Sequence, residues 1–219
     1  MTKIYGINGS PRRKNWNTYS LLESALKGAE SDGAETELIN LYDYTYKGCI
    51  SCLACKRKNN QTNGICAYKD DLTPIFEKLK EADGIIFGTP VYYLTVTGQF
   101  KSFLERLCFP LNRYLKDDSR VLDKIIPTGI IYSMNFNEEQ AKEYKIPQVL
   151  FSNKYALSLA YGDFEDLWVY DTYQFSDYSK YDCDVFDPNH KLKQKEEHFP
   201  IDLQNAYELG KRIAQKAVI

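Results

Sequence analysis

The amino-acid sequence predicts an α/β fold in which a five-stranded parallel sheet lies between helices on both faces. Short apolar runs alternate five times with segments whose apolar residues recur every three to four positions. Continuous apolar runs are typical of strands buried on both faces, and the longer period is typical of helices that cover such a sheet. Right-handed connections between parallel strands then give a three-layer sandwich.

The length and composition of the chain predict one cytoplasmic domain. The 219 residues carry 28 basic and 30 acidic side chains, a net charge of −2, and 43% of them are hydrophobic. No repeat or linker divides the sequence, so we assign residues 1–219 to a single domain. The charge balance predicts no nucleic-acid partner, and the lack of an apolar run of about 18 residues predicts no membrane span.

The first half of the sandwich can be followed along the chain. A strand, a Gly-Ser-Pro-Arg turn and a helix are predicted within residues 3–29, and a second strand within residues 36–41. Residues 44–69 form a cysteine-rich loop, and a helix follows with Pro74 in its first turn, where proline is tolerated. The continuously apolar run at residues 84–88 is the third strand.

The second half of the chain repeats the alternation of strand and helix. Pro127 indicates a bend near the start of one strand, and Pro147 interrupts one helical segment. The predicted elements are a helix with the apolar stripe Phe100, Phe103, Leu104 and Leu107, a strand at 124–134, helical segments at 138–160, a strand at 167–170, an irregular excursion at 174–199, and a helix whose apolar face runs from Leu203 to Ala217.

The turn between the first strand and the first helix predicts a phosphate site. A helix N-terminus offers free N–H groups and the positive end of its dipole to an anion. An ordinary capped turn remains the alternative, because Ser20 with Glu23 matches a capping box, and Asn17 or Thr18 would serve as an N-cap. The loop adds hydroxyls, amides and positive charge from Ser10, Thr18, Asn15, Asn17, Arg12, Arg13 and Lys14.

A second loop is expected to meet this turn. In open α/β sheets, ligands bind at the carboxyl edge where the strand order reverses, which for the order 2-1-3-4-5 lies between the first and third strands. The loops at residues 9–18 and 89–97 should therefore lie together. The second contains Pro90 and two adjacent tyrosines, which suit a flat, partly apolar ring. A phosphate pocket beside a flat pocket predicts FMN, unless the aromatic residues only cover the sheet edge.

Four of the six cysteines form a cluster in the sequence. Disulfides are rare in a reducing compartment, so clustered cysteines indicate a metal or redox role. A C-x2-C-x2-C-x10-C spacing favours a [4Fe–4S] cluster, whereas zinc more often takes two separated pairs. Free thiols or an empty site remain the alternative. The proposed metal ligands are Cys49, Cys52, Cys55 and Cys66.

Together these motifs resemble the NADPH-dependent FMN reductase family, and within it the iron–sulfur flavoprotein branch. The resemblance covers residues 3–106, and the chain departs from the family at Trp16, where relatives often have glycine, and in the long gap before Cys66. The matching motifs are Gly9-Ser10-Pro11-Arg12 with Asn17-Thr18, Gly48-Cys49-x-x-Cys52-x-x-Cys55 with Cys66 and Asp70-Asp71, Thr89-Pro90-Val91-Tyr92, and Gly98-x-x-Lys101-x-Phe103-x-x-Arg106.

The resemblance implies a flavodoxin-like fold, bound FMN and assembly into homodimers or homotetramers. It implies that Ser10, Arg12, Asn17 and Thr18 hold the phosphate, that Thr89, Pro90, Val91 and Tyr92 flank the isoalloxazine ring, and that the four clustered cysteines ligate the iron–sulfur cluster. Ser133, at the end of the fourth predicted strand, is a further expected contact of the flavin.

The expected function is an NAD(P)H-dependent reductase that passes electrons from reduced nicotinamide or a protein donor through FMN to an acceptor. A cluster beside the flavin would convert two-electron donation into single-electron steps. No catalytic side chain is predicted, because the cofactor carries the bond chemistry. The alternatives are a non-enzymatic electron carrier, a reductase whose cysteine loop binds no cluster, and a structural zinc protein.

Overall fold

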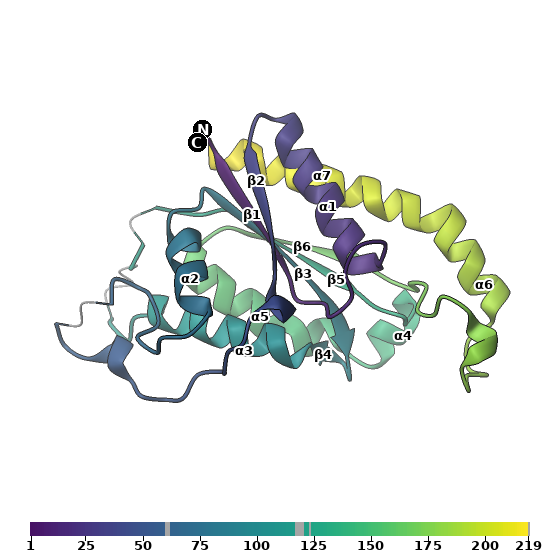
Figure 1. Cartoon of the computed structure of the whole chain (residues 1–219), viewed down its shortest axis with the longest axis horizontal. Coiled ribbons are helices and arrows are strands. Elements are labelled where there is room, and N and C mark those ends of the chain that lie inside the picture. The colour runs from purple at the N-terminus through teal and green to yellow at the C-terminus, as the bar shows by residue number, and fades with distance from the viewer. Residues whose placement is uncertain (60–61, 117–120, 123, 219) are drawn as a thin grey trace.

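The sheet has the predicted order. A computed structural model describes residues 1–59, 62–116, 121–122 and 124–218. The parallel strands occur in the order β2-β1-β3-β5-β6, which is 2-1-3-4-5 when the parallel strands alone are counted, and the α/β prediction is confirmed (Figure 1). Their bounds are β1 Lys3–Asn8, β2 Glu35–Asn40, β3 Gly84–Tyr92, β5 Thr128–Ser133 and β6 Phe164–Val169.

Helices cover both faces of this sheet. One face carries α1 (Asn17–Ser31) and α7 (Phe199–Ala217), and the other carries α2 (Leu72–Lys80), α3 (Gly98–Cys108) and α5 (Ile146–Tyr161) (Figure 1). Each face has its own cluster of buried apolar side chains. The sheet is therefore the middle layer of a sandwich, and its carboxyl edge remains open to a ligand.

Two glycines let α1 and α7 cross at very short range. A Cβ atom on Gly210 would lie 1.7 Å from the carbonyl oxygen of Ala25, and one on Gly28 would lie 1.9 Å from that of Tyr207. Only glycine fits at such contacts. This packing fixes the position of α1, and with it the turn before its first residue.

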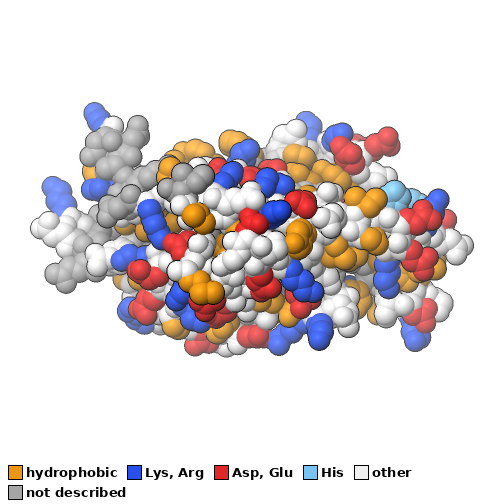
Figure 2. All heavy atoms as spheres, turned by 90° about the horizontal axis from the view of Figure 1, so that it is seen from above, with side chains coloured by type: hydrophobic (Ala, Val, Ile, Leu, Met, Phe, Trp, Pro, Cys, Tyr) orange, Lys and Arg blue, Asp and Glu red, His pale blue; other side chains and the backbone are white. Residues whose placement is uncertain are grey.

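The surface over α1 and α7 mixes charges of both signs. Lys and Arg side chains alternate with Asp and Glu across this face, with scattered apolar residues between them (Figure 2). In the part of the chain that the structure describes, no helix combines the length and apolar character needed to cross a bilayer.

Four strands differ from the sequence prediction, and one of them, β6, begins at Phe164 rather than Leu167. Strand β3 continues through Pro90 to Tyr92, and a two-residue strand, β4 (Thr95–Val96), pairs antiparallel with its end. Strand β5 begins at Thr128 rather than Lys124, after the bend that Pro127 indicates.

The prediction of an irregular excursion at residues 174–199 is wrong for the second half of that segment. It contains α6 (Pro188–Lys193) and a π-helical turn (Gln194–His198) that continues directly into α7. The carboxylate of Asp187 accepts a hydrogen bond of 2.9 Å from the Asn189 N–H, and Pro188 is the first helical residue. An N-cap followed by proline is a helix-start signal that the many polar residues of this segment conceal.

Candidate functional site

A cavity of about 440 Å³ opens at the carboxyl ends of β1, β3 and β5. The two loops that the sequence predicts to meet are both in its wall. One predicted contact lies elsewhere: Thr89 is buried in β3, and its hydroxyl donates a hydrogen bond of 3.1 Å to the Pro90 carbonyl. The predicted residues that line the cavity are Ser10, Arg12, Asn17, Thr18, Pro90, Val91, Tyr92 and Ser133.

One end of the cavity is the N-terminus of α1. The N-cap residue is Trp16, which has no side-chain acceptor, and no acidic residue lies in the first helical turn. The capping-box interpretation is wrong, because Ser20 and Glu23 lie inside the helix. No side chain in the described structure caps α1, so its first N–H groups lack hydrogen-bond acceptors from side chains. These N–H groups and the positive end of the helix dipole face the cavity, and no carboxylate of the first turn balances that positive charge.

Two hydroxyls lie beside this helix end. The Oγ atoms of Thr18 and Ser133 are 2.7 Å apart, and both residues are buried. Ser10 is also buried, and its hydroxyl accepts a 3.1 Å hydrogen bond from the Arg12 N–H, which tightens the turn. The first loop and the end of β5 therefore meet at one point, as the strand order requires.

The excursion after β6 also contacts this end of the cavity. The guanidinium of Arg12 donates to the carbonyl of Gln174 at 2.5 Å and lies 4.1 Å above the ring centroid of Trp16. The amide of Asn17 donates to the carbonyl of Tyr173 at 2.9 Å. Arg12 and Asn17 are thus held at the cavity by main-chain acceptors far away in the sequence.

The opposite wall is a tight hairpin between β3 and β4. Tyr93 and Leu94 form its two-residue turn and have φ values of 48° and 66°. Turns of this kind usually contain Asn-Gly, because side chains are disfavoured in the left-handed region. These two backbone conformations are strained, and both residues lie at the mouth of the cavity. Tyr93 is fully exposed there, and Leu94 is partly buried. Such strain is typical of ligand sites.

Replacing Tyr93 by Asn and Leu94 by Gly together tests this interpretation. We expect the free energy of unfolding to rise by about 1–2 kcal/mol, because the strain is relieved at two residues. We also expect the affinity for FMN to fall, because two apolar contacts are removed. Urea unfolding and a flavin-fluorescence titration measure the two effects, with Tyr93→Phe as the control that keeps ring and strain. An unchanged stability would contradict the strain argument.

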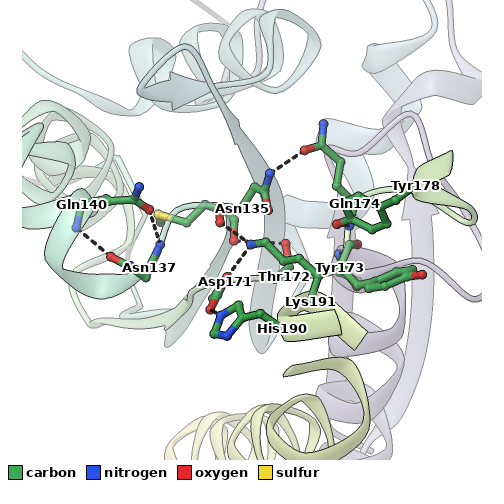
Figure 3. A network of polar contacts seen from close by, with 12 residues as sticks. Asn135, Asn137, Gln140, Asp171, Thr172, Tyr173, Gln174, Tyr178, His190 and Lys191 are labelled. Atoms are coloured by element: carbon green, nitrogen blue, oxygen red, sulfur yellow. Dashed lines mark hydrogen bonds and ion pairs between the residues drawn. The ribbon is translucent and has the colours of Figure 1, made fainter. Parts of the chain in front are cut away.

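Four lining residues had no signal in the sequence. Phe136 follows the end of β5, Thr172 follows β6, and the excursion contributes Gln174 and Phe186. The Asn135 amide, also in the wall, donates a 2.7 Å hydrogen bond to the side-chain oxygen of Gln174 (Figure 3). Their positions depend on how the excursion folds back over the sheet edge.

The four clustered cysteines line one small hollow beside α3. None of them is in a disulfide, and residues Ser51 and Leu53 between them have φ values of 55° and 56°, which curl the loop. Within the described ranges, no three His, Cys, Asp or Glu side chains converge closely enough to hold one metal ion. The cysteines therefore surround a shared space without meeting at a single point.

A buried arginine supports both ends of the cysteine loop. Arg106 of α3 donates to the carbonyls of Lys47 and Tyr68, at 3.0 and 2.8 Å, and forms an ion pair with Asp70. Burial alone would raise the pKa of Asp70, but the hydrogen bonds from Arg106 and from the Leu72 N–H hold it below its usual value. Arg106 also lines the hollow of the cysteines.

Comparison with known proteins places these features in one family. The family model described as NADPH-dependent FMN reductase matches residues 2–161. An iron–sulfur flavoprotein of Methanocaldococcus jannaschii is 43% identical over 104 residues, which are 48% of this chain and 51% of the relative. An iron–sulfur flavoprotein of Archaeoglobus fulgidus is 36% identical over 128 residues, 58% of this chain and 60% of the relative. The matches thus span only about half the length of these curated relatives.

Solved structures agree on the fold. An NAD(P)H:quinone oxidoreductase from Methanothermobacter marburgensis superposes with a TM-score of 0.70 at 16% identity, covering 97% of this chain and 96% of that one. An azoreductase from Bacillus anthracis gives 0.63 at 13% identity, covering 97% and 100%. At these identities the likeness shows the fold alone. Because the family model matches most of the chain, the protein belongs to the NADPH-dependent FMN reductase family.

Proposed function

We propose that the protein is an FMN-dependent oxidoreductase that accepts electrons from NADPH or NADH and passes them to a small-molecule or protein acceptor. The observation that carries the proposal is the uncapped N-terminus of α1 at one end of a cavity with an apolar opposite wall. That combination suits a ligand with a phosphate at one end and a flat ring at the other.

The residues divide between these two parts of FMN. Ser10, Arg12, Asn17 and Thr18 would bind the phosphate together with the first N–H groups of α1. Pro90, Val91 and Tyr92 would contact the ring, while Thr89 would act indirectly through its hydrogen bond to Pro90. Ser133, whose hydroxyl lies 2.7 Å from that of Thr18, would contact the flavin on the phosphate side. When bound, FMN supplies the electron and hydride chemistry, and the protein binds it, orients it and limits the access of water.

We also propose that Cys49, Cys52, Cys55 and Cys66 hold a [4Fe–4S] cluster. Four thiolates around one hollow are the donor set that such a cluster uses. The relatives named iron–sulfur flavoproteins support this assignment. A single zinc ion is the competing occupant.

Anaerobic purification with cofactor analysis tests the proposal. We expect one FMN and four iron atoms per chain, a flavin spectrum with a broad cluster absorbance, and steady NAD(P)H oxidation when an electron acceptor is present. Failure to retain or bind FMN at micromolar concentration would refute the flavin assignment. Zinc without iron would refute the cluster only, and bound FMN without turnover would favour an electron carrier.

A homodimer or homotetramer in the cytoplasm completes the proposed assignment. Phe151, Tyr155 and Leu159 lie four residues apart on α5 and are all exposed. Exposed apolar residues on one helix face are typical of a subunit contact. Light scattering of the purified protein measures the subunit number, and a monomer at micromolar concentration would contradict this part of the proposal.

A further inference from the structure

Two buried cations lie next to the two proposed redox sites. Among the residues that the structure describes, Arg106 and Lys191 are the only charged residues classed as buried, with 1% and 2% of their surface exposed. Arg106 lines the hollow of the four cysteines, and Lys191 contacts the wall of the flavin cavity. A buried ion pair adds little to stability relative to apolar packing, so its presence requires another explanation.

Lys191 lies directly behind a residue of the cavity wall. Its Nζ donates a 2.8 Å hydrogen bond to the main-chain carbonyl of Asn135, which lines the cavity (Figure 3). The same Nζ forms an ion pair with the carboxylate of Asp171. Phe186, another wall residue, lies with its ring centroid 4.9 Å from this ammonium group.

Of the two charged groups of the pair, the ammonium of Lys191 is the one that contacts wall residues. Lys191 contacts Asn135 on one side and Asp171 on the other, and the second oxygen of Asp171 is 2.6 Å from His190, which is exposed (Figure 3). The main chain of Asp171 also reaches the wall, through its N–H donor to the Phe136 carbonyl, but its carboxylate contacts Lys191 and His190, whereas the Lys191 ammonium contacts wall residues. Charges in such a water-poor wall are screened far less than charges on the surface.

We infer that Lys191, anchored by Asp171, is a positioning residue that stabilises the reduced state of the bound flavin relative to its oxidised state. Reduction adds electron density to the ring, and charge near the ring tunes its electronics. A cation behind the wall favours the more negative state by Coulomb attraction. The inference rests on the proposed function, and both residues lie beyond residue 161, outside the family match.

The ratio of the affinities for reduced and oxidised FMN measures this effect. We expect Lys191→Met to lower that ratio about tenfold, as a charge about 10 Å away would at an effective dielectric constant near 20. A tenfold change is about 30 mV in the midpoint potential of a two-electron couple. Asp171→Asn should move the ratio in the opposite direction, because the cation then acts without its counter-charge.

Two further variants separate tuning from simple loss of structure. Lys193→Met removes an exposed charge from the same helix and should leave the ratio within about twofold, because solvent screens that charge. Lys191→Arg keeps the charge and should retain most of the ratio. If Lys191 only held the excursion in place, its loss would lower the affinities for oxidised and for reduced FMN by the same factor. Unchanged ratios in Lys191→Met and Asp171→Asn would overturn the inference, while a parent protein that binds no FMN would overturn the proposed function as well.

Discussion

Replacing Arg106 by Met is expected to lower the free energy of unfolding by about 3–5 kcal/mol, the usual cost of removing one partner from a buried ion pair. The variant would leave the Asp70 carboxylate without its cation. It would also leave the carbonyls of Lys47 and Tyr68 without their donor. Because these residues lie near the two ends of the cysteine loop, the loop should be held to α3 less tightly, by its remaining hydrogen bonds from Tyr46 and Cys49.

Two measurements check this expectation. Urea unfolding gives the stability change, and the rate at which iodoacetamide alkylates the clustered cysteines reports on the loop, which should react faster in the variant. Lys101→Met removes an exposed charge from the same helix and should change the stability by less than about 0.5 kcal/mol. Arg106→Lys should be intermediate, because an ammonium group cannot donate in a fork to both oxygens of Asp70. A loss below about 1 kcal/mol for Arg106→Met would contradict the argument.

The regular parts of this protein could be predicted because each has a local pattern. Apolar runs buried on both faces identify β1, β3 and β5, and the strand order then determines which loops share an edge. The turn at Gly9-Ser10 and the segment at Pro90 meet for that reason alone. Eight of nine proposed flavin contacts line one cavity as a consequence.

Other parts of the site have no local pattern. Arg12 and Asn17 donate to main-chain carbonyls more than 150 residues away, and a carbonyl acceptor leaves no trace in residue identity. Tyr93-Leu94 does not match a hairpin turn, since both residues disfavour the conformation that they adopt. The capping-box interpretation failed because sequence alone does not determine whether the helix begins at Asn17 or at Leu21, after an N-cap at Ser20.

Replacing Asn17 by Asp is expected to weaken FMN binding strongly while it changes the stability of the empty protein little. Asn17 is the first residue of α1, whose first turn holds no acidic residue. A carboxylate there gains about 0.3–1 kcal/mol from the helix dipole, but it cannot donate the hydrogen bond that the Asn17 amide gives to the Tyr173 carbonyl. The two effects oppose each other, so the free energy of unfolding of the empty protein should change by less than about 1 kcal/mol. The same carboxylate would repel a phosphate dianion at the helix N-terminus, and the affinity for FMN should fall about a hundredfold.

Riboflavin provides the control ligand, because it has the ring without the phosphate. Its affinity should change by less than about threefold in Asn17→Asp, since the ring contacts lie on the opposite wall. Asn17→Ala loses the same hydrogen bond to the Tyr173 carbonyl but adds no charge, so it shows how much of the effect comes from the hydrogen bond alone. We expect Asn17→Ala to lower the affinity for FMN by about tenfold at most. Fluorescence titrations of both ligands against the three proteins give these ratios. Equal losses for FMN and riboflavin would mean that the substitution disturbs the cavity as a whole, and the N-terminus of α1 would not be the phosphate site.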